Sequence, residues 1–201
     1  MDQHTEDAAT AKSEATCRVG FLIIDMINDL AFPGAEPLLR AAGAMVNDIL
    51  DFRAQADEAG IPTIYVNDNF GQWRSERSEI AERAQREDSP ARDIAKALAP
   101  RPDDFFVIKP RFSGFYATNL QVLLPQRGIR RLILSGVATD ICVLFTAADA
   151  YMRQYDLWIP RNLVASDDPK RDAWALEIMR NSMGARTEPT TELALKSWLQ
   201  T

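Results

Sequence analysis

Histidine is nearly absent from this sequence, which has 201 residues and a single histidine, His4. One histidine at the start of the chain excludes Ser-His-Asp and Cys-His catalysis within the fold, and also a metal site with several histidine ligands. Cysteine is almost as scarce. Cys17 and Cys142 are far apart and form no CxxC pair, so the sequence suggests neither a disulfide framework nor a cysteine-based zinc site.

The sequence also lacks a long apolar run and an excess of basic residues. No apolar stretch approaches the length needed to span a bilayer, and the acidic start MDQHTEDAATAKSEAT lacks the basic and apolar segments of a secretory signal. The formal net charge is −6, with Lys and Arg interspersed among Asp and Glu, so nucleic acid is a poor candidate partner. We therefore expect a cytoplasmic protein without membrane contact, with a disordered tail over residues 1–17 and one domain over residues 18–201.

Short apolar runs alternate with segments of helical periodicity along the rest of the chain. Runs typical of strands covered on both faces occur at residues 18–25, 61–68, 103–109, 130–136 and 156–160, and a last short strand is expected within 184–190. Helices are expected over 38–50 and within 118–128, 140–154, 169–183 and 191–199, with Asp168 and Gly184 capping the helix at 169–183. This alternation predicts a parallel sheet with helices on both faces, a doubly wound three-layer α/β/α fold that binds ligands beyond the carboxyl ends of its strands.

Residues 71–104 form the least regular part of the sequence, rich in charge and proline. Glu79 with Arg83, and Glu82 with Arg86, have the spacing of ion pairs within a helix. We expect short helices and loops here that cover a site.

An acid, a cation and a thiol fall at the carboxyl edge of the expected sheet. Asp25 ends the first strand, Lys109 ends the third, and Cys142 opens the helix after the fourth. A helix N-terminus and a nearby ammonium group both favour the thiolate, the nucleophilic form of cysteine. With no histidine in the fold, Asp25 is the remaining candidate for proton transfer, and backbone N–H groups of the turn GVATDIC are candidates to hold an oxyanion. Each of these side chains alone is more often structural, as free cysteine commonly fills a core.

Three segments resemble the signature segments of the isochorismatase-like cysteine hydrolases: FLIIDMINDL, FFVIKPRFSGF and LILSGVATDICVLFTAADAY. The resemblance extends from about residue 18 to residue 199. It implies a six-stranded parallel sheet of Rossmann-like form and a catalytic triad of Asp25, Lys109 and Cys142. It further implies a cis Val137–Ala138 peptide bond, an oxyanion hole made by the Ala138 and Cys142 N–H groups, and assembly as a homodimer or homotetramer.

Departures from the family patterns narrow the expected chemistry. Nicotinamidases of this family carry a metal site after the second strand, built from an Asp and histidines, whereas here the segment reads VNDNFGQW, with Phe70 in place of the first histidine. Asp68 alone does not hold zinc, so we expect no metal and no other cofactor. Isochorismatases proper cleave a vinyl ether and lack the nucleophilic cysteine, which makes ether hydrolysis the weaker alternative for a chain that has Cys142.

The sequence therefore predicts a cysteine hydrolase that cleaves a C–N bond of a small amide or carbamoyl compound through a thioester. The alternative from another class is a catalytically idle binding or regulatory protein of the same fold. A nucleotide-binding domain is disfavoured because no G-x-G-x-x-G follows the first strand. The candidate pocket residues are Asn28, Phe32, Phe70, Trp73, Arg111, Phe112, Phe115 and Tyr116, among which Arg111 is a candidate anchor for a substrate carboxylate.

Overall fold

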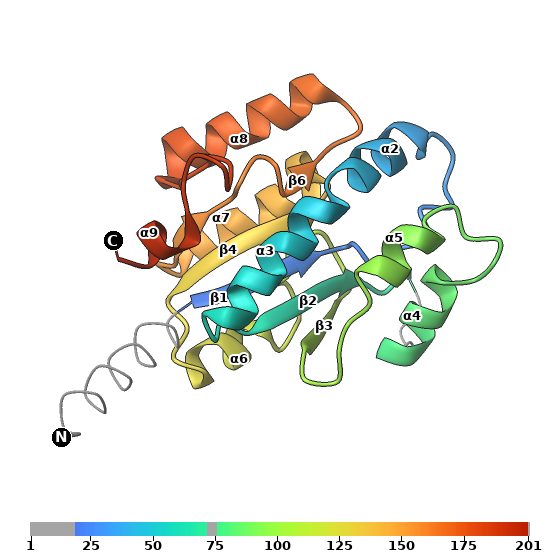
Figure 1. The fold of residues 1–201 in the computed structure, drawn as a ribbon, viewed down its shortest axis with the longest axis horizontal. Helices are drawn as coiled ribbons and strands as arrows, with labels where there is room; N and C mark the ends of the chain where they lie inside the picture. The colour runs from blue at the N-terminus through green and yellow to red at the C-terminus, as the bar shows by residue number, and fades with distance from the viewer. Residues whose placement is uncertain (1–18, 72–75, 201) are drawn as a thin grey trace.

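A parallel sheet forms the centre of the protein (Figure 1). The computed structural model describes residues 19–71 and 76–200. The expected tail at residues 1–17, and the predicted pocket residue Trp73, lie outside the described residues. The domain bounds predicted from the sequence therefore stay a prediction.

All the strands of the sheet run parallel, and the first strand of the chain lies in the middle. The six strands are β1 (Val19–Ile24), β2 (Thr63–Asp68), β3 (Phe105–Lys109), β4 (Arg131–Val137), β5 (Asp156–Trp158) and β6 (Val164–Ala165). Their order is β3-β2-β1-β4-β5, with β6 also paired to β4. Because β1, β2 and β3 on one side and β4 on the other are parallel, their carboxyl ends meet at one edge of the sheet.

The unbroken apolar sequence of β1 follows from cover on both faces of the sheet. Every residue of β1 is buried. Successive side chains of a strand point to opposite faces, and here Phe21 and Ile23 join one core cluster while Leu22 and Ile24 join the other. A strand between two cores has no position for a polar residue, which is why the run is continuous.

Two layers of helices cover the sheet. One core cluster takes its helical residues from α2 (Glu36–Ala44), α3 (Val46–Glu58), α4 (Arg77–Ala84), α5 (Arg92–Ala97) and α9 (Leu195–Leu199). The other takes them from α6 (Leu120–Gln126), the single π-helical turn η1 (Thr139–Val143), α7 (Leu144–Met152) and α8 (Pro169–Met183). These layers confirm the predicted doubly wound fold. Within residues 19–71 and 76–200, no helix combines the length and the apolar character needed to cross a membrane.

The sixth strand is not where the sequence predicted it. It is formed by Val164 and Ala165, whereas the segment 184–190 contributes only one isolated bridge, between Arg186 and Trp158. The Arg186 N–H donates to the Leu157 carbonyl and the Ile159 N–H donates to the Arg186 carbonyl, but the pairing ends before Pro189, which has no N–H to donate. The predicted caps of α8 are confirmed, since the Asp168 side chain accepts the N–H of Lys170 and Gly184 is left-handed, with φ 66°.

The ion pair predicted within α4 between Glu79 and Arg83 is also wrong. Arg83 Nε lies 2.6 Å from Asp29 Oδ2, in the loop that follows β1. The Glu79 carboxylate instead accepts the backbone N–H of Glu76 at 2.9 Å, as part of the N-terminal cap of α4. Both side chains thus have partners that the local helical spacing does not reveal.

The second predicted ion pair, between Glu82 and Arg86, is also not formed. Arg86 contacts Asp88 instead, at 3.3 Å. The side chains of Arg86 and Asp88 are 67% and 77% exposed. An ion pair so open to water adds little to stability.

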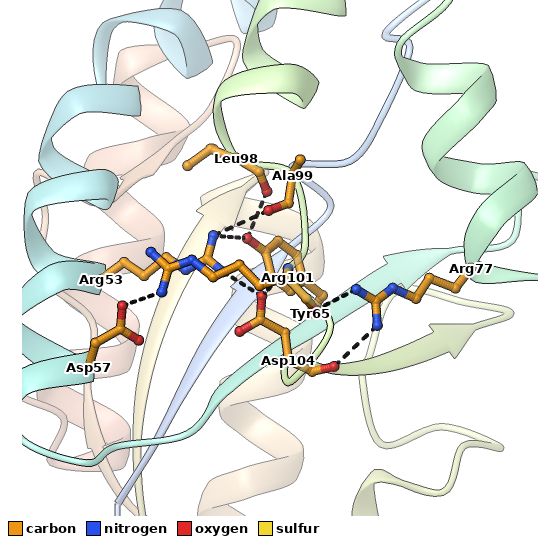
Figure 2. Close-up of polar contacts among 8 residues, drawn as sticks. All are labelled: Arg53, Asp57, Tyr65, Arg77, Leu98, Ala99, Arg101 and Asp104. Atoms are coloured by element: carbon orange, nitrogen blue, oxygen red, sulfur yellow. Dashed lines mark hydrogen bonds and ion pairs between the residues drawn. The ribbon is translucent and has the colours of Figure 1, made fainter.

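A buried arginine ties one helical layer to the sheet (Figure 2). Arg53 of α3 is 2% exposed; its guanidinium donates to Tyr65 Oη at 2.9 Å and pairs with Asp104. Tyr65 in turn donates to the carbonyl of Leu98 at 2.7 Å. The network therefore holds α3, β2 and the segment before β3 in one arrangement.

The same segment fixes the start of α4. Arg77 donates to the Arg101 carbonyl at 2.6 Å and to the Asp104 carbonyl at 3.4 Å. Since Arg83 pairs with Asp29 near the other end of the helix, α4 is held at both ends. These contacts fix the position of α4 relative to the segments around it.

Replacing Arg53 by Ala is expected to lower the free energy of unfolding by about 3–5 kcal/mol, because Asp104 would remain buried without its cation. Chemical denaturation measures the loss. The matched control is Arg86→Ala, which removes an exposed arginine and is expected to cost less than about 1 kcal/mol. Equal losses in the two variants would contradict the structural role assigned to Arg53.

Candidate active site

The structure brings Asp25, Lys109 and Cys142 into direct contact at the carboxyl edge of the sheet. Asp25 follows β1, Lys109 ends β3, and Cys142 lies in η1 after β4. Lys109 Nζ is 2.8 Å from Asp25 Oδ2 and 3.4 Å from Cys142 Sγ. Three residues separated widely in sequence thus form one cluster, because the strands that carry them are parallel members of one sheet.

The Lys109 ammonium group is fully buried and meets a third acceptor. Asp68, at the end of β2, places Oδ2 3.6 Å from Lys109 Nζ. An ammonium group has three N–H donors, and the contacts with Asp25, Cys142 and Asp68 match them in number. The buried charge is therefore compensated from three sides, as a fully buried lysine requires.

Unusual backbone conformations at the ends of two adjacent strands, β1 and β4, orient the Asp25 side chain and shape the turn before Cys142. Asp25 has φ 53°, a left-handed conformation uncommon outside glycine, and its Oδ1 accepts the Asp68 N–H at 2.7 Å. Gly136 has φ 104°, and a Cβ there would lie 2.0 Å from the Ile24 carbonyl oxygen, so only glycine fits. The next peptide bond but one, Val137–Ala138, is cis.

The turn that carries Cys142 is anchored from the β6 side. The Asp140 N–H donates to Ser166 Oγ at 3.2 Å, and Ser166 Oγ donates to Asp140 Oδ1 at 2.5 Å. The N–H groups of Ile141 and Val143 both donate to the Ala138 carbonyl, each at 3.1 Å. These bonds hold the backbone around Cys142 in a fixed position before any ligand binds.

The electrostatics of the cluster differ from the expectation that Cys142 rests as a thiolate. Burial, and then the charge of Asp25, raise the pKa of the Cys142 thiol well above its ordinary value, and Lys109 only partly opposes them. Burial also raises the pKa of Asp25 against the opposing charge of Lys109. For Lys109, burial lowers the pKa, but the neighbouring acids, Asp25 first, together outweigh it and the pKa is raised. The raised pKa of Cys142 favours a neutral thiol, and the 2.8 Å contact between Lys109 and Asp25 favours an ammonium–carboxylate pair.

A cavity of about 440 Å³ opens onto this cluster. Of the predicted pocket residues, four line it: Asn28, Phe32, Phe70 and Phe112. The remaining described ones do not, because Phe115 is buried in the core while Arg111 and Tyr116 are exposed on the surface. Arg111 does not line this cavity, so the carboxylate anchor predicted there stays a prediction.

Several lining residues escaped prediction from the sequence. Arg83 and Asp29 were missed because their pairing joins segments 54 positions apart in the chain. Leu30, Leu38 and Ile141 also line the cavity and are not among the pocket residues predicted from the sequence. A signal was present for Asp29 and Leu30, which lie in the resembling segment FLIIDMINDL, and for Ile141, which lies in LILSGVATDICVLFTAADAY.

The side chains around Asp68 decide whether this part of the site could hold a metal ion. Over residues 19–71 and 76–200, no three or more His, Cys, Asp or Glu side chains are grouped so that they could hold a metal ion. Asp68 is engaged by Lys109 and by the Phe70 N–H, which donates to Asp68 Oδ1 at 2.6 Å. The described residues therefore do not fit the Asp–histidine metal site of the nicotinamidases.

Comparisons with known proteins place this fold in one family. The Isochorismatase domain matches residues 19–192. The uncharacterized isochorismatase family protein YaaI of Bacillus subtilis strain 168 is 40% identical over 171 residues, which cover 85% of this chain and 92% of that protein. The chain belongs to the isochorismatase family and is a hydrolase.

Two further proteins are similar to this chain, one over part of its sequence and one in its fold. The ureidoacrylate amidohydrolase RutB of Methylorubrum extorquens is 48% identical over 62 residues, covering 31% of this chain and 25% of that protein. The crystal structure of N-carbamoylsarcosine amidase from Thermoplasma acidophilum matches with a TM-score of 0.62 and 27% identity, covering 88% of this chain and 99% of that chain. Both names denote hydrolysis of a C–N bond.

The charge arrangement predicts opposite effects of two substitutions on thiol reactivity. Below the thiol pKa, Asp25→Asn is expected to speed alkylation of Cys142 by iodoacetamide about tenfold or more, because it removes the negative charge that disfavours the thiolate. Lys109→Met is expected to slow the same reaction, because it removes the stabilising cation. Alkylation rates across a pH series measure both, with thermal unfolding as the control for folding. An Asp25→Asn variant that reacts no faster than the parent would contradict this electrostatic account.

Proposed function

We propose that the protein hydrolyses a C–N bond of a small amide or carbamoyl compound, with Cys142 as nucleophile. The observation that carries the proposal is the contact of the buried Lys109 with both Asp25 and Cys142, two residues that line the cavity. The names of RutB and of the N-carbamoylsarcosine amidase support the bond type. A cavity of about 440 Å³ fits a small substrate.

In the first half of the proposed reaction, Asp25 removes the Cys142 proton as sulfur attacks the substrate carbonyl carbon. Lys109 Nζ contacts both Asp25 and Cys142, so the two side chains lie beside one another and the proton passes from the thiol to the carboxylate. The raised pKa of Asp25 makes it a stronger base than an ordinary carboxylate. The new oxyanion is stabilised by the Ala138 and Cys142 N–H groups, and collapse breaks the C–N bond as Asp25 returns the proton to the leaving amine. A thioester on Cys142 remains.

In the second half, water replaces the amine. Asp25 takes a proton from the water as its oxygen attacks the thioester carbonyl carbon, and the C–S bond then breaks. The carboxylic acid leaves, and the proton on Asp25 returns to the thiol. Throughout, Lys109 keeps its charge; it orients Asp25 and limits the cost of negative charge on sulfur or carboxylate.

The alternative of an idle binding protein of the same fold predicts the same cavity without turnover. The complete cluster of acid, ammonium and thiol favours the enzyme, because a purely binding site has no need for a buried lysine with three acidic or thiol partners. Cytoplasmic location and assembly as a homodimer or homotetramer stay predictions.

Ammonia release from a panel of small primary amides and carbamoyl compounds tests the proposed activity. Cys142→Ala is expected to retain less than about 1% of the parent rate while keeping the unfolding temperature, because the change is small and Lys109 is the hydrogen-bond partner of the thiol among the described residues. Cys17→Ala, a change at the other cysteine of the sequence, is the matched control and is expected to keep full activity. Several per cent of activity in Cys142→Ala would overturn the thiol mechanism.

A further inference from the structure

The cavity wall carries a cation that the proposed reaction does not use. Arg83, near the C-terminal end of α4, lines the same cavity as Asp25 and Cys142. Among the described residues that line this cavity, Arg83 is the only lysine or arginine. Its side chain is 38% exposed, so it is reachable from the cavity without being loose on the surface.

Two contacts hold the Arg83 guanidinium in place. Its Nε donates to Asp29 Oδ2 at 2.6 Å, and Asp29 Oδ1 in turn accepts the Ala31 N–H at 3.2 Å. Its guanidinium carbon lies 4.7 Å from the centroid of the Phe70 ring, a cation–π distance. A cation held on two sides loses little further freedom when it binds a ligand.

Arg83 has N–H donors that are free to bind a ligand, whereas the three N–H donors of Lys109 are matched by its three contacts. A guanidinium carries five N–H groups, and within residues 19–71 and 76–200 only Nε of Arg83 has a hydrogen-bond partner. The terminal edge, which suits a carboxylate in bidentate geometry, has no such partner among those residues. Arg83 also borders a more polar hollow beside α4 that Phe70 does not line, whereas Phe70 and Arg83 both line the cavity of Cys142, so the stacked guanidinium lies against the wall of this cavity.

The charges around the cavity are arranged unevenly. Asp25 and Asp68 lie beside Lys109 at the sheet edge, where a substrate anion would be repelled. Between that edge and Arg83 the wall is largely apolar, with Leu30, Phe32, Leu38, Phe112 and Ile141 among its residues. An anion is therefore favoured at the Arg83 end, and an uncharged amide at the Cys142 end.

We propose that Arg83 binds a carboxylate of the substrate, so that the substrate class is an amide or carbamoyl compound with an acidic group beyond a short apolar spacer. This inference rests on the proposed function, since it assumes that the scissile group lies at Cys142. Arg83 thus takes the role of carboxylate anchor that the sequence suggested for Arg111. Asp29 and Phe70 act as positioning residues for Arg83.

Paired probes that differ only in charge test this inference through binding. The probes are succinamate, glutaramate and adipamate, each compared with its neutral diamide, and the readout is protection of Cys142 from iodoacetamide. In the parent protein, the best monoamide is expected to protect at a concentration at least about tenfold lower than its diamide, as expected for a hydrogen-bonded charge pair. Equal protection by acid and diamide at every chain length would overturn the inference.

Variants then assign the preference to Arg83. Arg83→Gln is expected to abolish the preference for the acid while protection by the diamide stays within about twofold of the parent. The double variant Asp29→Asn/Arg83→Gln, which leaves no carboxylate without its cation, is expected to do the same and decides the matter if the single variant misfolds. Arg86→Gln, an exposed arginine outside this cavity, is expected to keep the preference. A preference that persists in the folded Arg83 variants would overturn the inference.

Ammonia release, measured in parallel, separates this inference from the proposed activity. Selective protection without ammonia from any probe supports the Arg83 subsite and counts against hydrolysis of these amides. Ammonia released equally from acids and diamides, by the parent and by Arg83→Gln, supports hydrolysis and overturns the role of Arg83.

Discussion

The site depends on one buried positive charge, the ammonium group of Lys109. Burying an ammonium is costly unless acceptors surround it, and here three groups from separate segments converge on one nitrogen: Asp25, Asp68 and Cys142. That convergence is possible only because parallel strands end at one edge. The left-handed backbone of Asp25 and the close approach of Gly136 to the Ile24 carbonyl then fix the final positions of the side chains in the cluster.

This charge arrangement implies that the Cys142 thiolate forms during the reaction and is not present in the resting protein. A thiol whose pKa is raised by burial and by a neighbouring carboxylate stays protonated at rest, which limits oxidation and unselective alkylation. The carboxylate that suppresses the thiolate is also the base that creates it. On this account, proton transfer to Asp25 accompanies the attack of sulfur on the substrate, and Lys109 keeps its own charge throughout.

Much of the fold was predictable because continuous apolar runs mark strands buried on both faces, and reactive residues at their ends mark the ligand edge. The sixth strand was misplaced because a two-residue strand leaves no pattern, while 184–190 has strand-like residues whose pairing ends before Pro189. Arg83 was assigned to Glu79 from local helical spacing, and the longer-range contact with Asp29 is invisible to such a rule. Arg111 and Phe115 follow Lys109 closely in sequence, yet one is exposed on the surface and the other is in the core.

The central claim, that Cys142 forms a thioester by way of Asp25, is tested most directly by partitioning with hydroxylamine. Two substrates that share one acyl group but release different amines pass through the same thioester, so the ratio of hydroxamate to acid must be the same for both. We expect equal ratios, and neither product from Cys142→Ala. A ratio that changes with the leaving amine, or turnover that yields no hydroxamate, would contradict the account.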